Sequence, residues 1–175
     1  LAIDITQKKE EEQRLKLLES VITNATDSIL ITEAEPFDLP GPRIIYVNDA
    51  FSKMTGYTKE EEIGKTPRIL QGPKTSRKAA DKIRKALENW NSCEVELMNY
   101  RKNGEEFWVN FTVIPIANEK GWFTHWIAIE RDITLRKKQE QEKEQLIREL
   151  KQNISDIRQF AYITSHNLRA PLSNL

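Results

Sequence analysis

The segment that decides the fold covers residues 94–134 and reads EVELMNYRKNGEEFWVNFTVIPIANEKGWFTHWIAIERDIT. Apolar and polar residues alternate along it, which is the period of a strand with one buried face. The dipeptide Asn103-Gly104 is a strong hairpin signal, and residues 118–121 form a second turn, so we predict three consecutive antiparallel strands. The middle strand places four apolar side chains on one face, which we expect to be buried: Phe107, Val109, Phe111 and Val113.

Two more strands precede this segment, at residues 28–32 and 43–47, and a proline-containing loop at 36–42 separates them. Three helices are then predicted between residues 48 and 89. Asn48 or Asp49 caps the first, a capping box opens the second, and the third covers about 76–89. Five strands with helices inserted after the second predict an α+β domain, with helices on one face of a five-stranded antiparallel sheet.

Charge is balanced overall but is unevenly distributed. The chain has 27 basic and 27 acidic residues in 175, a formal net charge of zero, which excludes a generally basic nucleic-acid binder. No apolar run is long enough to span a bilayer, and the lone Cys93 fits a reducing compartment. We therefore expect a cytoplasmic segment without a metal site, and a membrane anchor upstream of it stays open.

Charged residues are concentrated in two flanking segments that the pattern predicts to be helices. The first covers residues 7–24 and has an apolar stripe on an otherwise charged surface. The second begins after Thr134 and has a heptad pattern, with Ile147 and Ile154 at one seam position and Leu150 and Ile157 at the other. We interpret residues 135–152 as a polar linker helix and predict a parallel coiled-coil homodimer, with the segment 153–175 starting a dimerisation helix.

A short internal repeat suggests a second domain upstream. Residues 2–9 (AIDITQKK) resemble residues 128–138, in which a strand end runs into a charged helix. We expect residues 1–6 to be the end of a preceding domain of the same kind. Chance similarity over so short a match is the alternative.

Five segments in order resemble a PAS domain, and the resemblance covers the domain that we place at residues 25–134. They read IIYVNDAF at 44–51, MTGY at 54–57, EIGK at 62–65, NYRKNG at 99–104 and RDIT at 131–134. Membership of this family implies a sensor module, in which the sheet and its helices enclose a pocket and flanking helices carry the signal.

The most similar subgroup is the flavin-binding LOV photosensor, whose motif GxNCRFLQGP resembles GKTPRILQGP at residues 64–73. LOV photochemistry needs a cysteine thiol, and Pro67 stands at that position. Of the other residues that hold flavin in LOV domains, four match here: Arg68, Gln71, Arg84 and Asn99. Thr66 and Val109 replace asparagines, and Glu130 replaces a glutamine. From these losses, and from the added anion, we expect no cofactor within residues 1–175, flavin included.

The resemblance predicts a pocket, and so does the alternation of side chains between the two faces of each strand. Its residues are Arg68, Gln71, Arg84, Asn99, Phe111, Trp126 and Glu130. Such a composition suits an unidentified small ligand, although a filled core requires the same apolar face. The two arginines are candidates for holding a phosphate, or they are ordinary solvated side chains.

Near the C-terminus, FAYITSHNLRAPL at residues 160–172 resembles the phosphoacceptor box of sensor histidine kinases, whose usual form is HELRTPL. The resemblance implies that His166 accepts the γ-phosphoryl of ATP, with Asn167, Arg169 and Pro171 as supporting motif residues. The family commonly has an acid directly after the histidine and a Thr or Asn three residues beyond that acid. Asn167 and Ala170 stand there instead, which puts phosphatase activity in doubt.

The resulting hypothesis is a sensor and signal-transmission fragment of a two-component histidine kinase. The full-length protein would be the enzyme, because the domain that binds ATP and Mg²⁺ is not within these residues. Its partners would be that kinase domain and a response-regulator receiver domain. Two alternatives are a non-enzymatic PAS module for dimerisation or relay, and a flavin-binding LOV-like sensor.

Overall fold

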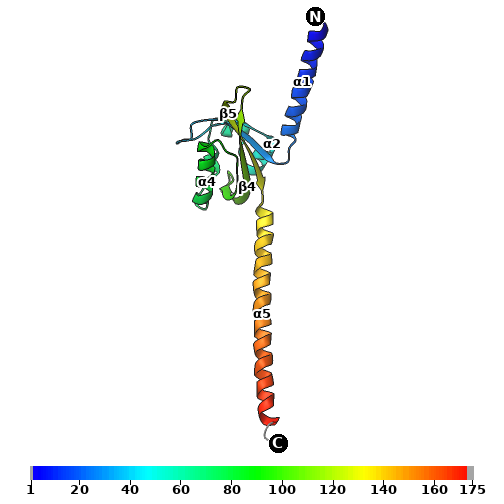
Figure 1. The fold of residues 1–175 in the computed structure, drawn as a ribbon, viewed down its shortest axis with the longest axis vertical. Coiled ribbons are helices and arrows are strands. Elements are labelled where there is room, and N and C mark those ends of the chain that lie inside the picture. Colours follow the sequence, from blue (N-terminus) through cyan, green and yellow to red (C-terminus); the bar gives the residue numbers. More distant parts are fainter. Residues whose placement is uncertain (1, 173–175) are drawn as a thin grey trace. The chain divides into compact units, whose positions relative to one another are not determined.

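The computed structural model describes the backbone of residues 2–172 and the side chains of residues 7–167. The chain divides into two units, the first ending at Thr134 and the second beginning at Leu135. The elements in chain order are α1 (Ala2–Thr23), β1 (Ser28–Glu33), β2 (Ile44–Val47), α2 (Asp49–Thr55), α3 (Lys59–Glu62), the 3₁₀ turn η1 (Pro67–Leu70), α4 (Arg77–Glu88), β3 (Cys93–Tyr100), β4 (Glu106–Ala117), β5 (Phe123–Asp132) and α5 (Thr134–Leu172) (Figure 1).

The predicted sheet is confirmed. Its strand order is β2-β1-β5-β4-β3, and every neighbouring pair is antiparallel. The two hairpins at residues 103–104 and 118–121 join β3 to β4 and β4 to β5. The register places Ala128 of β5 opposite Leu30 on one side and Val113 on the other, so the inner faces of three strands form one apolar surface.

Local signals explain the helices that cover this surface. The buried Asn48 side chain caps α2 by accepting from the backbone N–H of Phe51 at 3.0 Å. Gly56 ends α2 in the left-handed region, with φ of 79°. At the start of α3 the Glu61 carboxylate accepts from the Thr58 N–H at 3.0 Å, as in the predicted capping box.

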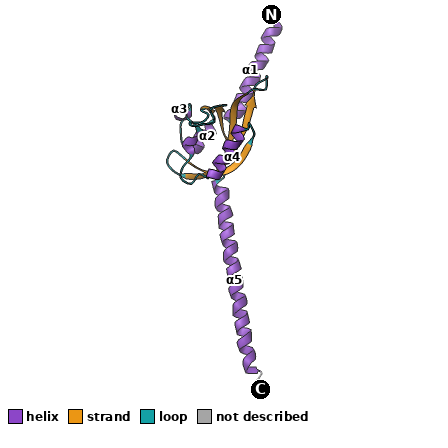
Figure 2. Cartoon of the chain, turned by 60° about the vertical axis from the view of Figure 1, so that its left-hand side comes forward, coloured by secondary structure: helices purple, strands orange, loops and turns teal. Residues whose placement is uncertain are grey.

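The core lies between the inner face of the sheet and the helices α2 and α4 with η1 (Figure 2). Its largest fully buried apolar side chains are Trp126, Phe51, Phe107, Leu30 and Ile44. Gly72, just before α4, lies against the ring of Tyr100: a Cβ there would be 2.2 Å from Cε2 of that ring. Only glycine permits this approach, which fixes the segment between η1 and α4.

The predicted strand end at residues 2–6 is not observed, because α1 is helical from Ala2. A strand needs a neighbouring strand to pair its N–H and C=O groups, and the described residues offer none there, whereas a helix satisfies these groups internally. The preceding domain that we inferred from the repeat stays a prediction. C-terminal to the domain in the sequence, α5 is one unbroken helix through the predicted linker boundary at 152–153. No helix within the described residues combines the length and apolarity needed to span a bilayer.

Candidate functional site

The candidate site is a cavity of about 280 Å³ between the inner face of the sheet and the helical layer. Its size is close to the lower end of the roughly 300–1,000 Å³ typical of ligand sites. All seven residues predicted for the pocket lie on its wall, namely Arg68, Gln71, Arg84, Asn99, Phe111, Trp126 and Glu130. The structure thus brings together residues from η1, α4, β3, β4 and β5, while their role in binding stays a prediction.

One end of the cavity is apolar and rigid. Trp126 is 1% exposed, and its indole Nε1–H donates to the Ala34 carbonyl at 3.0 Å. The Trp90 ring stacks on the Trp126 ring, with centroids 5.2 Å apart and planes 3° from parallel. Phe37 in turn meets Trp90 edge-on at 5.1 Å. A flat, fixed aromatic wall of this kind suits a planar ligand.

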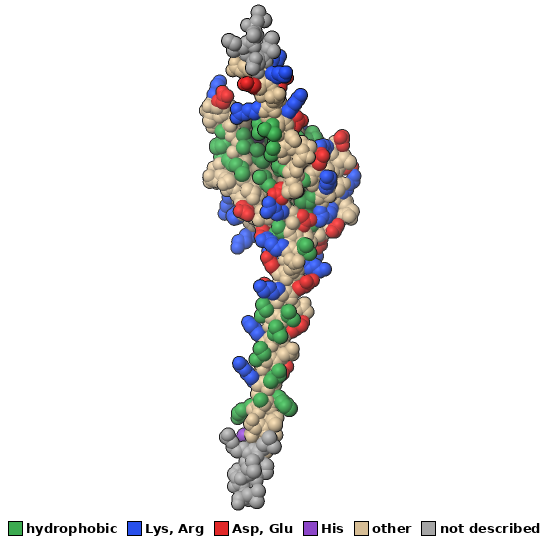
Figure 3. Space-filling view, turned by 90° about the vertical axis from the view of Figure 1, so that its right-hand side faces the viewer, with side chains coloured by type: hydrophobic (Ala, Val, Ile, Leu, Met, Phe, Trp, Pro, Cys, Tyr) green, Lys and Arg blue, Asp and Glu red, His purple; other side chains and the backbone are tan. Residues whose placement is uncertain are grey.

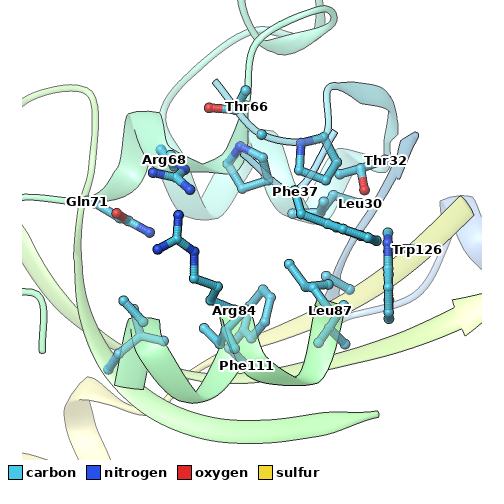
Figure 4. A pocket seen from close by; sticks show the side chains of 18 of the residues that line it. Leu30, Thr32, Phe37, Thr66, Arg68, Gln71, Arg84, Leu87, Phe111 and Trp126 are labelled. Atoms are coloured by element: carbon cyan, nitrogen blue, oxygen red, sulfur yellow. The ribbon is translucent and has the colours of Figure 1, made fainter. Parts of the chain in front are cut away.

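Basic side chains gather at another part of the wall. Figure 4 shows Arg68, Gln71 and Arg84 pointing toward one another, with Trp126 on the opposite side of the cavity. The only ion pair that the described residues make with either arginine joins Arg84 Nε to Glu88 Oε1 at 3.8 Å, and both of these side chains are half-exposed. Such a pair is weak, so the guanidinium groups are available to an anionic group entering the cavity.

Two buried polar atoms on the wall have no hydrogen-bond partner among the described residues: Oδ1 of Asn99 and Oε2 of Glu130. These side chains are 5% and 2% exposed. Most buried polar atoms in native proteins are paired with protein or ordered water, so orphaned atoms that face a cavity mark places where a bound molecule completes the pairing.

Glu130 lies near a second buried carboxyl group, that of Glu62 on α3. Burial and, as the smaller cause, the nearby Glu62 carboxyl together raise the pKa of Glu130 to about 8. Burial also raises the pKa of Glu62 to about 7, although the Thr55 hydroxyl, which donates to Glu62 Oε1 at 3.0 Å, opposes this rise. At neutral pH the Glu130 carboxyl therefore retains its proton, and Glu62 is partly protonated.

Strand parity alone did not separate cavity from core. Phe107 and Val109 share the inner face of β4 with Phe111, yet both are fully buried and neither lines the cavity. Sequence reasoning also missed the loop between β1 and β2, from which Phe37 and Leu39 line the cavity. Two apolar side chains within a proline-rich loop were the only signal for that contribution.

The sole cysteine is not part of this site. Cys93 is buried and does not line the cavity, whereas Pro67 does. Among the described residues no group of three or more His, Cys, Asp or Glu side chains is arranged to hold a metal ion.

The predicted phosphoacceptor lies in the second unit. His166 is exposed on α5, and its ring is 6.3 Å from that of Tyr162, one helical turn earlier. Asn167 is exposed as well. The side chains of Arg169 and Pro171 lie outside the described residues.

A family model described as "PAS domain" matches residues 26–135, well over half of the chain. This chain belongs to the PAS-domain family. The PAS domain is 42% identical over 97 residues to the blue-light-activated histidine kinase of Brucella anthropi, a match that covers 55% of this chain. The chain spans about a fifth of the length of that relative, 20%.

Solved structures place the PAS domain in the LOV-like subgroup. The LOV domain of the Erythrobacter litoralis EL346 blue-light-activated histidine kinase matches with a TM-score of 0.58 and 30% identity, covering 63% of this chain and 99% of that one. A second structure, from a study described as "Flavin Analogue Sheds Light on Light-Oxygen-Voltage Domain Mechanism", matches with a TM-score of 0.62 and 28% identity over 74% of this chain and 93% of that one.

These matches contradict the expectation that flavin is excluded as a cofactor of this PAS domain. That expectation was wrong on two physical points. Arg68, Gln71, Arg84 and Asn99, the retained flavin-site residues, do converge on one cavity. In addition, Glu130 is not the anion that its formal charge suggests, because burial keeps its carboxyl group protonated near neutral pH.

Proposed function

We propose that this chain is the sensor and signal-transmission part of a sensor histidine kinase, and that its PAS domain holds a flavin without a covalent bond. The cavity carries the proposal, because it joins a flat apolar wall and unpartnered buried polar atoms to a pair of arginines. A phosphorylated flavin has the matching parts: a planar ring, a polar ring edge and an anionic tail. When bound, it would supply blue-light absorption and redox chemistry.

The residues of the cavity divide into three roles. Trp126 and Phe111 would contact the faces of the ring, Gln71, Asn99 and Glu130 would bond its polar edge, and Arg68 and Arg84 would hold the phosphate. The ligand is held by these contacts alone, since Pro67 offers no thiol and Cys93 lies away from the cavity.

Flavin binding is tested with two probes that differ only in the phosphate group. We expect flavin mononucleotide and riboflavin both to bind, as measured by quenching of flavin fluorescence. Replacing Arg68 and Arg84 together by Ala should weaken mononucleotide binding at least tenfold and leave riboflavin binding nearly unchanged. Lys85→Ala, an exposed change on α4 outside the cavity, is the matched control. If neither flavin mononucleotide nor riboflavin binds, the flavin part of the proposal is refuted.

The output half of the proposal concerns His166. In the full-length protein a kinase domain would transfer the γ-phosphoryl of ATP to the His166 ring, and a response-regulator aspartate would then receive it. Exposure of His166 on α5 supports this role, because an acceptor has to be reachable by another domain. The match to a protein named as a blue-light-activated histidine kinase supports it too.

A parallel homodimer through α5 belongs to the same proposal. Ile147, Leu150, Ile154 and Ile157 are all exposed, the last of them by 67%, and hydrophobic side chains follow this length of the helix (Figure 3). Their heptad spacing lets two such helices bury them against each other. We place the homodimer, together with the rest of the chain, in the cytoplasm.

Phosphotransfer is tested by incubating the chain with its separately made kinase domain and labelled ATP. Label should appear on the wild-type chain and be lost from His166→Gln. The other histidine of the chain, His125, is a half-buried strand residue, and His125→Gln should keep the label. Label that survives in His166→Gln would overturn the assignment and favour a non-enzymatic relay module.

A further inference from the structure

Two buried acids, Glu130 and Glu62, lie close together in the interior, and the proposed function does not explain their protonation. Glu130 lies on the inner face of β5, with Ser28 of β1 and Phe111 of β4 as its cross-strand neighbours. Glu62 reaches the same interior from α3 and is fully buried. Three oxygens in this region have no partner among the described residues, namely Ser28 Oγ, Glu62 Oε2 and Glu130 Oε2.

Among the described residues, no cation forms an ion pair with Glu130. The charged groups that share a cavity wall with it on the strand side are Asp27, Arg101, Glu105, Arg131 and Asp132. These are paired with one another: Arg131 with Asp27 at 2.5 Å, and Arg101 with Asp132 at 2.6 Å and Glu105 at 3.4 Å.

On the helical side, too, no cation among the described residues forms an ion pair with Glu130. The charged groups there are Asp49, Lys53, Arg68, Asp81 and Arg84. Asp49 pairs with Lys59 at 2.6 Å. The charged group that does act on Glu130 is Glu62, which has the same sign and therefore opposes ionisation.

We propose that Glu130 faces the cavity as a neutral carboxylic acid and donates its proton in a hydrogen bond to an acceptor atom on the edge of the bound ring, so that ligand affinity depends on this proton. A buried carboxylate without cations or N–H donors is strongly disfavoured, whereas the acid form has one O–H donor to offer. The inference rests on the proposed flavin function. Glu130 is a positioning residue, and its counterpart in LOV-type motifs, a glutamine, has a donor that does not titrate.

The ligand-free protein provides the first test. Infrared difference spectra between pH 6 and pH 9 should show the carbonyl stretch of a protonated carboxyl group at the lower pH. The part of this band that comes from Glu130 should be lost in Glu130→Gln, and the part that comes from Glu62 should be lost in Glu62→Gln. Glu33→Gln, a matched change of an exposed glutamate on β1, should keep both parts. If the wild-type protein has no such band, the proposal fails whatever the protein binds.

Riboflavin affinity as a function of pH is the second test. Riboflavin has no phosphate to titrate, and the range is kept below the pH at which its ring ionises. Wild-type affinity should fall about tenfold per pH unit once Glu130 ionises. Glu130→Gln keeps a donor, so its affinity should be flat with pH, whereas Glu130→Met should bind about tenfold more weakly or worse at every pH.

Glu62→Gln distinguishes this mechanism from a general effect of pH on the fold. Removing the neighbouring carboxyl lowers the pKa of Glu130, so the loss of affinity should begin at a lower pH than in the wild-type chain. Circular dichroism checks that each variant is folded. If riboflavin binds but its wild-type affinity does not change with pH, or if the pH dependence persists in Glu130→Gln, this inference is overturned and the flavin function stands. Absence of binding at every pH overturns the flavin function with it.

Discussion

The buried acid pair predicts an unusual dependence of stability on pH in the ligand-free protein. The Glu130 carboxyl ionises near pH 4.5 in the unfolded chain and near pH 8 in the folded one. Between these values the native state holds a proton that the unfolded chain has released. Raising the pH therefore favours unfolding: the stabilisation is complete below the lower pKa and is lost as the pH rises through the upper one.

The magnitude follows from the same two pKa values. Each pH unit inside the window costs about 1.4 kcal/mol for one group. Glu130 alone should lower the free energy of unfolding by about 3 kcal/mol between pH 5.5 and 7.5, and by on the order of 5 kcal/mol across the whole window. This is a large part of the roughly 5–15 kcal/mol that stabilises an ordinary domain.

Urea unfolding of the PAS domain within the whole chain, followed by tryptophan fluorescence at pH 5.5, 6.5 and 7.5, measures this slope. Glu130→Gln should remove most of it, and Glu62→Gln part of it. Glu33→Gln, on the exposed side of β1, should leave it unchanged. Asp27, Asp132 and Glu61 have lowered pKa values, so their contributions are lost only as the pH falls below this range. Wild-type stability that stays flat or rises from pH 5.5 to 7.5 would refute the reasoning.

Three further predictions concern stability and assembly. Asn48→Ala should lower the free energy of unfolding by about 3 kcal/mol in urea, because the buried side chain accepts from Ile29 and Phe51 and donates to Asp27; a loss below about 1 kcal/mol would contradict this. Gly72→Ala should cost about 2 kcal/mol or more, since its Cβ would overlap the Tyr100 ring, and an unchanged melting temperature would argue against that contact. Ile154→Asp should convert the homodimer to a monomer in sedimentation, whereas Ser155→Asp, off the heptad seam, should not; a wild-type chain that is monomeric at high concentration would remove the coil from the proposal.

The parts of the fold that the sequence predicted are those with local causes. The turn at Asn103-Gly104, the Asn48 cap and the period-two pattern of β4 each depend on a few adjacent residues, and all appear as expected. The strand end at residues 2–6 was wrong, because a strand depends on a distant partner that the sequence pattern does not reveal.

The cavity was predictable only in part, because it too depends on residues that are distant in the sequence. Parity identifies the inner face of a strand, but it does not say which part of that face is covered by other side chains. Phe107 has the Arg101 guanidinium 4.4 Å above its ring and is fully buried. Phe111, four residues further along the same face of β4, lines the cavity. The contribution of Phe37 depends on the path of a loop that has no periodicity at all.

Glu130 shows why a residue's chemistry cannot be taken from its type alone. Counted at its formal charge, it adds a carboxylate to the pocket and argues against a ring ligand with acceptor atoms. Burial beside a second acid reverses that conclusion, because the pair retains protons that an exposed glutamate would lose. The replacement of an amide by an acid then keeps a hydrogen-bond donor in the cavity and makes that donor sensitive to pH. What the replacement would change is therefore the pH at which the proposed site binds its ligand, and burial beside Glu62 is the cause.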